Sequence, residues 1–274
     1  MVKKFYTSVG AALIVFALIM LAETFLSPFA PSVRDAAAIM PPDLTAVNAL
    51  YGTLPPAPAM PSAHASTYIP RYEPTDRRQA DAIAEPFAPR EASETDDEFL
   101  YICENGLLTI SKHFNHIVYR TENMATAPPV RAGGTPSEQA AAFLTSYALP
   151  VPYGLAETEE AEDSCTIRLY PRLGGTDCLA FPAIVSLSPD GALLTLEVYS
   201  FAFDRLSGCK LLPFSAACAA LPLDFPEDTR ITLERVAFVY TLKDSILQPG
   251  YLVEGVYADG ELFRCILPAA VFAQ

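Results

Sequence analysis

The sequence contains no tryptophan and three histidines, and these shortages argue against several kinds of active site. His64 lies in a Pro-rich stretch, whereas His113 and His116 are three residues apart. Residues three apart on a strand face opposite sides of a sheet, so these two histidines do not share a metal ion unless the chain turns between them. Sugar-cleaving sites pair two carboxylates in a pocket usually lined by aromatic rings, and the chain has no Trp to line one.

The motifs of well-known catalytic and cofactor sites are also missing. GxSxG, HExxH, P-loop and GxGxxG patterns do not occur. The acidic run from Glu157 to Asp163 lacks the alternating Asp/Asn positions and central Gly of a calcium loop, so we expect a solvated loop there. We therefore predict a protein that is not an enzyme, with no catalytic, metal-binding or cofactor-binding residues and no cofactor. Aromatic residues at strand spacing are predicted to pack in the core: Tyr170, Tyr199, Phe201, Phe203, Phe238 and Tyr240.

Positive charge is scarce. The chain has 18 Lys and Arg residues against 32 Asp and Glu residues, which gives a formal net charge of −14. Without the two N-terminal lysines, the charge of the remainder is about −16. Phosphate backbones and anionic lipid surfaces repel such a domain. We therefore predict no nucleic-acid partner.

The six cysteines leave two interpretations open. Six is an even number, so disulfides are permitted in an oxidising compartment, with 15 possible pairings. None of the cysteines forms a CxxC pair. Alternatively, several are small buried apolar residues, because the chain is long enough to build a core without covalent staples.

An apolar segment near the N-terminus predicts a membrane anchor. The run from Phe5 to Ala22 has no charged residue, and it extends to Leu26 if Glu23 lies at the level of the lipid headgroups. Roughly 20 apolar helical residues cross a bilayer. Lys3 and Lys4 precede the run, which places the N-terminus in the cytoplasm.

This segment sets the predicted localisation: a single-pass protein of the cell membrane with an extracytoplasmic C-terminal domain. The predicted cytoplasmic tail is 1–4 and the transmembrane helix is 5–27, which contacts the membrane from Phe5 to Leu26. A cleaved secretory signal is the alternative, because it has the same charged start and apolar middle. Either interpretation exports the remainder of the chain.

Residues 28–98 are predicted to be a Pro-rich extracytoplasmic linker. A chain of this composition does not bury enough apolar surface to fold, and a Pro-rich chain is extended and stiff. The alternative for part of it is a short helix from Asp43 to Tyr51 that acts as a docking segment. The prolines that break helices and strands run through the whole stretch: Pro41, Pro42, Pro55, Pro56, Pro58, Pro61, Pro70, Pro74, Pro86 and Pro89.

The predicted folded domain spans 99–274 and begins with a hairpin. Its strands are Phe99–Cys103 and Leu107–Ser111, and the turn is formed by Asn105-Gly106, which supplies positive φ values.

A helix is predicted from Thr135 to Pro150. Thr135 caps it, Pro136 takes its first position and Glu138 completes a capping box. Ala140, Phe143, Leu144 and Tyr147 recur at helical spacing and form one apolar face.

Two successive units of one helix and three strands are predicted, with 135–208 and 209–274 as possible sub-units. The fold class is α+β, with antiparallel sheets and helices on one face. Asp190-Gly191 and Asp259-Gly260 stand at corresponding turns. The predicted strands are Cys165–Tyr170, Leu179–Leu187 and Leu193–Phe203, then Ile231–Leu242, Gly250–Tyr257 and Leu262–Leu267, with a short Ala-rich helix at Pro213–Leu221.

This arrangement resembles the YycH/YycI-type, PepSY-like regulators of Gram-positive bacteria. The resemblance covers Thr135–Phe272, above all Ile231–Tyr240, Leu247–Val253 and Asp259-Gly260. It implies restraint of a cell-wall sensor histidine kinase of a two-component system, and it implies no catalytic residues. The long Pro-rich linker, the six cysteines, and Gly250 and Tyr251 where that family often has Trp depart from the pattern and leave the particular kinase in doubt.

We therefore expect a non-enzymatic extracytoplasmic regulator that contacts a membrane sensor kinase or a cell-envelope protein. Two alternatives stay open. One is a structural or assembly protein of the cell envelope or spore. The other is an enzyme or ligand-binding domain, which would have a deep pocket with convergent polar groups.

Overall fold

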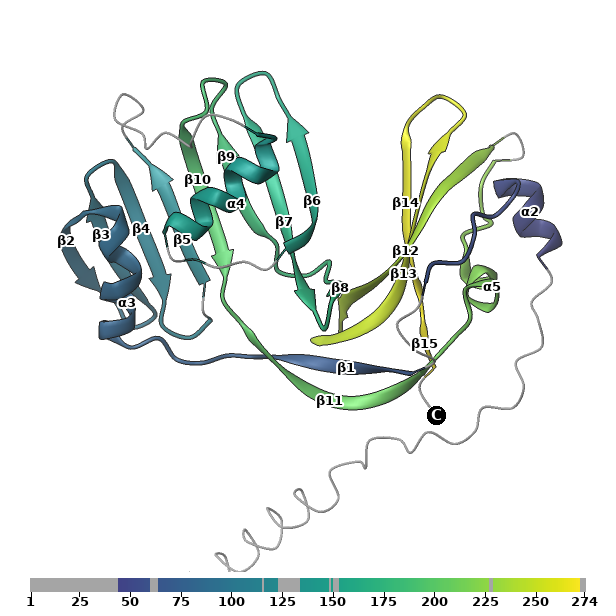
Figure 1. Cartoon of the computed structure of the whole chain (residues 1–274), viewed down its shortest axis with the longest axis horizontal. Coiled ribbons are helices and arrows are strands. Elements are labelled where there is room, and N and C mark those ends of the chain that lie inside the picture. Colours follow the sequence, from purple (N-terminus) through teal and green to yellow (C-terminus); the bar gives the residue numbers. More distant parts are fainter. Residues whose placement is uncertain are drawn as a thin grey trace, which may run out of the picture. The chain divides into compact units, whose positions relative to one another are not determined.

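Two antiparallel sheets and a few short helices make up the fold in the computed structural model, which confirms the predicted α+β class (Figure 1). The structure describes residues 44–59, 64–114, 116–122, 134–147, 149, 153–226 and 229–271. The predicted cytoplasmic tail and membrane helix lie outside these residues. Residues 41–270 form one compact unit.

The larger sheet has nine strands in the order β2-β3-β4-β5-β10-β9-β7-β6, with β8 paired to β7. The pairings among these strands are antiparallel, and they join neighbours in sequence except where β5 meets β10 and β7 meets β9. The bounds are β2 Pro89–Glu94, β3 Glu98–Cys103, β4 Gly106–Ser111, β5 His116–Thr121, β6 Tyr153–Glu160, β7 Cys165–Leu173, β8 Thr176–Asp177, β9 Ala183–Leu187 and β10 Leu193–Tyr199.

The smaller sheet has six strands in the order β12-β13-β1-β11-β15, with β14 paired to β13. Strand β1 pairs along β11 and meets β13 at Tyr68↔Leu247. The bounds are β1 His64–Arg71, β11 Ala202–Leu211, β12 Ile231–Lys243, β13 Ile246–Tyr257, β14 Leu262–Pro268 and β15 Ala270–Val271.

Reciprocal capping boxes begin both of the longer helices. At α4, Glu138 N donates to Thr135 Oγ1 (3.4 Å) and Thr135 N donates to Glu138 Oε2 (2.8 Å), as the sequence predicts. At α3, Asp76 and Gln79 exchange the same two bonds at 2.8 and 2.9 Å. The helices are α2 Thr45–Tyr51, α3 Arg77–Ala84, α4 Pro136–Ser146 and α5 Phe214–Ala217, with 3₁₀ turns η1 Glu85–Phe87 and η3 Cys218–Ala220.

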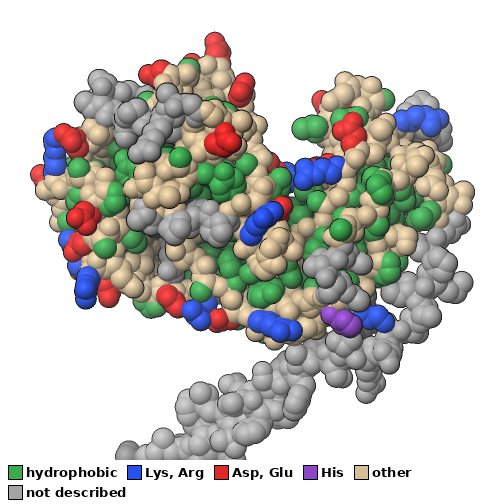
Figure 2. Space-filling model, viewed as in Figure 1, with side chains coloured by type: hydrophobic (Ala, Val, Ile, Leu, Met, Phe, Trp, Pro, Cys, Tyr) green, Lys and Arg blue, Asp and Glu red, His purple; other side chains and the backbone are tan. Residues whose placement is uncertain are grey.

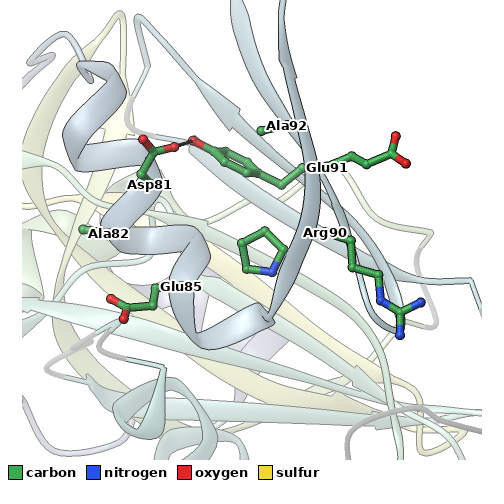
Figure 3. Close-up of a pocket in the computed structure, with 8 residues that line it drawn as sticks. Asp81, Ala82, Glu85, Arg90, Glu91 and Ala92 are labelled. Carbon is green, nitrogen blue, oxygen red and sulfur yellow. Dashed lines mark hydrogen bonds between the residues drawn. The ribbon is translucent and has the colours of Figure 1, made fainter.

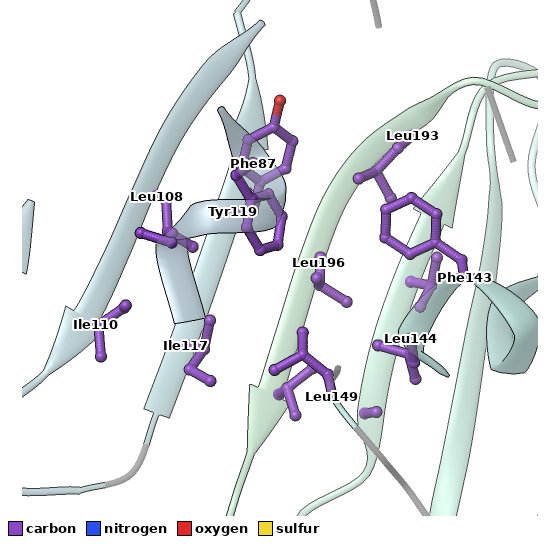
Figure 4. Close-up of a cluster of buried hydrophobic side chains, with 14 of the residues drawn as sticks. Phe87, Leu108, Ile110, Ile117, Tyr119, Phe143, Leu144, Leu149, Leu193 and Leu196 are labelled. Carbon is purple, nitrogen blue, oxygen red and sulfur yellow. The ribbon is translucent and has the colours of Figure 1, made fainter. Parts of the chain in front are cut away.

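Each sheet buries one face beneath helices. On the larger sheet, Phe143 and Leu144 of α4 lie against Leu193 and Leu196, and Phe87 packs on Tyr119 (Figure 4). On the smaller sheet, α2 and α5 cover a second core that includes Val47, Tyr51, Phe214, Tyr251 and Phe263.

The prediction of a linker at 28–98 is wrong for much of that stretch. Helix α2 lies within Asp43–Tyr51, where a short docking helix was the alternative to a linker, and β1, α3, η1 and β2 follow α2. The prolines are tolerated because they fall at boundaries: Pro89 starts β2, and Pro86 lies in η1. Pro70 is near the end of β1, beyond its contact with β13, so β13 does not need its missing N–H.

Two further strand predictions need correction. The predicted strand Leu193–Phe203 is two strands, because β10 ends at Tyr199 in the larger sheet and β11 starts at Ala202 in the smaller one. The acidic stretch predicted as a loop is partly strand β6, which ends at Glu160 and pairs with β7. More strands therefore follow α4 than the three of the predicted unit. The second predicted unit has the expected order, because α5 is followed by β12, β13 and β14.

Candidate binding surface

His113 and His116 contact different carboxylates. His116 Nε2 is 3.0 Å from Glu197 Oε1, and its ring stacks on Tyr199 with 4.4 Å between centroids. His113 Nε2 is 3.7 Å from Asp97 Oδ1. No group of three or more metal-ligating side chains occurs in the part of the chain that the structure describes.

A cavity of about 460 Å³ lies between α3 and β2 (Figure 3). In it, the Tyr101 hydroxyl donates to Asp81 Oδ1 at 2.8 Å, and Arg77 Nε lies 2.9 Å from the same oxygen. The Tyr101 hydroxyl and then Arg77 hold the pKa of Asp81 below its usual value, because both stabilise the carboxylate. Arg90 and Glu91 extend away from Asp81.

The ion pairs of Arg77, beside this cavity, join two elements. Arg77 also lies 3.5 Å from Glu94 of β2, and its guanidinium sits 5.7 Å from the Phe99 ring centroid and 5.5 Å from that of Tyr101. These contacts hold the edge strand β2 against α3. Asp81 already accepts bonds from Tyr101 and Arg77, so it is a poor general base. We therefore assign the cavity a structural role.

A second cleft, of about 550 Å³, opens where the chain crosses between the two sheets. Its floor is aliphatic and continues the core of the larger sheet. Its rim comes from the β1–α3 connection, from the start of α3 and from the β10–β11 crossover. The floor includes Ile83, Ile110, Ile117, Leu149 and Val198, and the rim includes Glu73, Thr75, Gln79, Tyr199, Ser200 and Phe201.

Three rings beside this cleft form what we call the aromatic patch: Tyr72, Phe114 and Phe201. Tyr72 meets Phe114 at 5.9 Å and Phe201 at 5.1 Å between centroids, both edge to face. Tyr72 is 49% exposed and Phe114 is 58% exposed. The three rings come from three different connections, so tertiary structure alone brings them together.

Further aromatic residues support the aromatic patch from below. Phe181 contacts Phe201 at 4.6 Å, and its backbone has a left-handed φ of 55°, which is strained for a bulky residue. Backbone strain such as that of Phe181 persists where the surrounding packing over-determines a conformation.

Tyr199 also lies beside the aromatic patch. Burial, and then the bond to Glu197, raise the pKa of Tyr199 to about 12.

The predicted core aromatics divide into three sets. Phe203 and Phe238 are half-buried, and each packs against a buried cluster. Tyr170 and Tyr240 are buried, as expected. Tyr199 and Phe201 are half-buried and line the cleft, because they flank the crossover between sheets. The sequence carried no signal for Tyr72, which lies in the stretch predicted as linker.

The six cysteines are free thiols, and four of them are buried: Cys103, Cys178, Cys209 and Cys218. Burial raises the pKa of Cys103, Cys178 and Cys218 to about 11. A thiol with such a pKa is protonated at neutral pH and is a weak nucleophile.

Acidic and basic side chains are interspersed on the face seen in Figure 2. This distribution agrees with the ion pairs between strands, such as Arg235–Glu254 and Arg168–Glu159. Within the described residues, none of the helices combines the length and apolarity needed to cross a membrane.

Comparison with known proteins gives little to transfer. No protein-family model and no curated protein matches the sequence. Among solved structures, the C-terminal domain of YpeB from Bacillus megaterium is similar with a TM-score of 0.38 and 11% identity, over 72% of this chain and 94% of that domain. Similarity at this level assigns neither residues nor an activity.

Proposed function

We propose that the chain is a non-enzymatic, membrane-anchored extracytoplasmic module that regulates a membrane sensor kinase or a cell-envelope protein by direct contact. The observation that carries the proposal is the aromatic patch, in which the exposed rings of Tyr72 and Phe114 join Phe201, a residue that lines the aliphatic cleft. Contiguous exposed aromatic surface is typical of protein-binding sites.

The geometry of the aromatic patch favours a protein partner over a sugar. Tyr72 meets Phe114 at 87° and Phe201 at 79°, so each ring covers part of a neighbouring ring. Sugar binding by stacking would need an open ring face, whereas an apolar side chain packs into the angle between rings and into the aliphatic floor. Because the rings are already packed together, binding costs little side-chain entropy.

The predicted anchor supplies the second contact. Elements α2, β1, α3 and β2 occupy much of 28–98, so the spacer that we propose is shorter than 28–98. A shorter spacer raises the effective concentration of a domain near a partner in the same membrane. Two weak contacts, one by the membrane helix and one by the aromatic patch, then reinforce each other. The resemblance to YycH/YycI-type regulators motivates the choice of a sensor kinase as partner.

Site-specific photocrosslinking of the full chain in native membranes tests this proposal. A photoreactive amino acid at position 72 or 114 is expected to give a discrete crosslink to a membrane or envelope protein. The Tyr72→Ser/Phe114→Ser double variant should weaken recovery of that protein at least tenfold, because two aromatic anchors are lost. Ile102→Ser is the matched control, since Ile102 is also 49% exposed but lies on β3.

A negative result has a clear form. If positions 72 and 114 give no crosslink while a probe at position 102 does, the aromatic patch is not the contact surface. Replacing Phe5–Leu26 with an unrelated membrane helix tests the other contact. If the chain then regulates its partner as before, the segment acts only as a tether.

A further inference from the structure

Strand β14 is protected less than β2 and β6, the edge strands of the larger sheet: its ladder has no bulge, and it carries one charged residue, Arg264, and a proline only at its last position, Pro268. Among the described strands it pairs with β13 alone. Natural proteins protect free edges with charges, prolines or bulges. Strand β2 has Pro89, a bulge and exposed Arg90, Glu91 and Glu94, and β6 carries Glu157, Glu159 and Glu160.

The exposed side chains of β14 are mainly apolar. Leu262 is 85% exposed and Ile266 is 42% exposed, on the same face. Arg264 lies between them, 2.7 Å from Glu157 and 3.7 Å from Glu254. Glu157 and Glu254 partly offset the charge of Arg264, which is the one charged residue within Leu262–Pro268.

The turn before β14 fixes which backbone groups face outward. Gly260 N donates to Tyr257 O (2.9 Å) and Tyr257 N donates to Glu261 O (2.8 Å), with a φ of 89° at Gly260. This is a three-residue hairpin loop with a glycine bulge, so Tyr257 and Glu261 form a hydrogen-bonded pair.

Antiparallel pairs alternate between bonded and non-bonded along the ladder. In the register Gly255↔Phe263 and Val253↔Cys265, Phe263 and Cys265 therefore bond to β13. The N–H and C=O groups of Leu262, Arg264 and Ile266 then point away from β13, toward the free edge.

A second copy of β14 does not suit this edge. Antiparallel self-pairing centred on Arg264 would place Leu262 opposite Ile266, but it would also place the two Arg264 side chains opposite each other. Like charges directly across a ladder are destabilising. Pairing centred on Cys265 would place Arg264 opposite Ile266 and lose the apolar match.

We propose that the free edge of β14 binds an extended segment of a protein partner by strand addition. The segment has apolar side chains opposite Leu262 and Ile266 and an uncharged residue opposite Arg264. Main-chain bonds to the three outward residues provide affinity, and the alternating side chains provide selectivity. The inference rests on the proposed function for the partner being a protein, and it adds a surface distinct from the aromatic patch.

The test uses the purified full chain in detergent micelles and, as probe, a capped seven-residue peptide of alternating threonine and valine. Amide hydrogen exchange is measured with and without peptide. The peptide should slow exchange at Leu262, Arg264 and Ile266, and leave Phe263 and Cys265 unchanged because these amides are already bonded. Ile266→Pro removes one outward N–H, so binding should weaken about fivefold.

Ala92→Pro on β2 is the matched control. Thr95 N donates to Glu98 O (2.9 Å) at the β2–β3 hairpin, and in the register Ala92↔Tyr101 the Ala92 N–H also points outward. This variant should bind the peptide as the native chain does. If Ile266→Pro fails to fold, Leu262→Lys places a charge on the edge while keeping the backbone, and it should weaken binding by a similar factor.

Three results would overturn the inference: unchanged exchange at the three outward amides with saturating peptide, equal binding by Ile266→Pro or Leu262→Lys, or protection of these amides by chain concentration alone, which would indicate a second copy. A failure here leaves the crosslinks at positions 72 and 114 unaffected, and failure of those crosslinks leaves the peptide test standing. The two proposals are therefore separable.

Discussion

The guanidinium of Arg264 on β14 lies 2.7 Å from a carboxylate oxygen of Glu157 on β6, so an ion pair joins an edge strand of one sheet to an edge strand of the other. The second oxygen of Glu157 accepts a hydrogen bond from the Tyr170 hydroxyl at 2.8 Å. Arg264 also approaches Glu254, which in turn pairs with Arg235 at 3.3 Å. The link between the sheets is therefore a network of partly exposed groups.

A double-mutant cycle with Arg264→Met and Glu157→Gln should give a coupling energy of about 0.5–1 kcal/mol in the free energy of unfolding. Glutamine keeps an acceptor for Tyr170, so the cycle isolates the ion pair. The coupling should shrink at high salt, since both groups are solvent-accessible. Urea unfolding at low and high ionic strength measures it. The Arg168–Glu159 pair, which lies within one sheet, is the control.

The β3–β4 hairpin shows how a correct prediction can rest on the wrong cause. The strands lie where Asn105-Gly106 placed them. Yet Gly106 does not have the positive φ expected of a tight turn and is already the first residue of β4. A Cβ built on Gly106 would lie 2.1 Å from the backbone oxygen of Arg120, so close approach of β5 demands the glycine.

Gly106→Ala should therefore destabilise the fold by about 2–3 kcal/mol, in the range of over-packed positions, because the backbone of β5 has to move. Gly154→Ala is the comparison: its Cβ would meet the ends of the Arg172 and Asp177 side chains, which can rotate away. Thermal and urea unfolding of both variants measures the difference. Equal losses would contradict the backbone clash.

Local signals predicted those elements whose cause is local. The capping box of α4 and the Asp190-Gly191 and Asp259-Gly260 turns lie where the sequence places them. The capping box of α3, formed by Asp76 and Gln79, is equally visible in the sequence. The prolines around it led to the prediction of a linker instead of a helix.

What escaped prediction depends on tertiary context. Strand β1 has Pro70 near its end, and it is a strand because β11 pairs along its whole length. The division of Leu193–Phe203 at Ser200 has no local signal, since both halves have the composition of a strand. The aromatic patch could not be predicted for the same reason: its rings come from three separate connections.

Helix α2 should be stabilised mainly by packing, because it has seven residues and no side-chain cap at its N-terminus. Tyr51 is buried, its ring lies 5.6 Å from Phe263, and its hydroxyl donates to the Pro222 carbonyl. Tyr51→Ala should cost about 3–5 kcal/mol, as large core truncations do. Tyr51→Phe removes the hydrogen bond alone and should cost about 1 kcal/mol. Urea unfolding of the two variants separates packing from hydrogen bonding.

Tyr51 should also contribute to loss of stability at high pH. Burial raises its pKa from 10.0 to about 12. Because the folded state holds the proton more tightly, this contribution is fully present below pH 10 and is lost as the pH rises toward 12. The stability of the native chain should fall more steeply than that of Tyr51→Phe across this window. Parallel curves of unfolding free energy against pH would contradict it.

The cysteines provide a test of the buried cores that needs no substitution. Burial, and then Glu160, raise the pKa of Cys165, but its side chain is partly exposed, whereas Cys103, Cys178 and Cys218 are buried with pKa values near 11. Thiolate is the reactive form, so exposure should decide which thiol reacts first. Iodoacetamide at pH 8 should label Cys165 well before these three residues, and in urea all six cysteines should react at similar rates. Mass spectrometry of the digested chain reports the order. Early labelling of Cys178 in native conditions would mean that the core around Tyr240 and Leu247 opens far more readily than its packing implies.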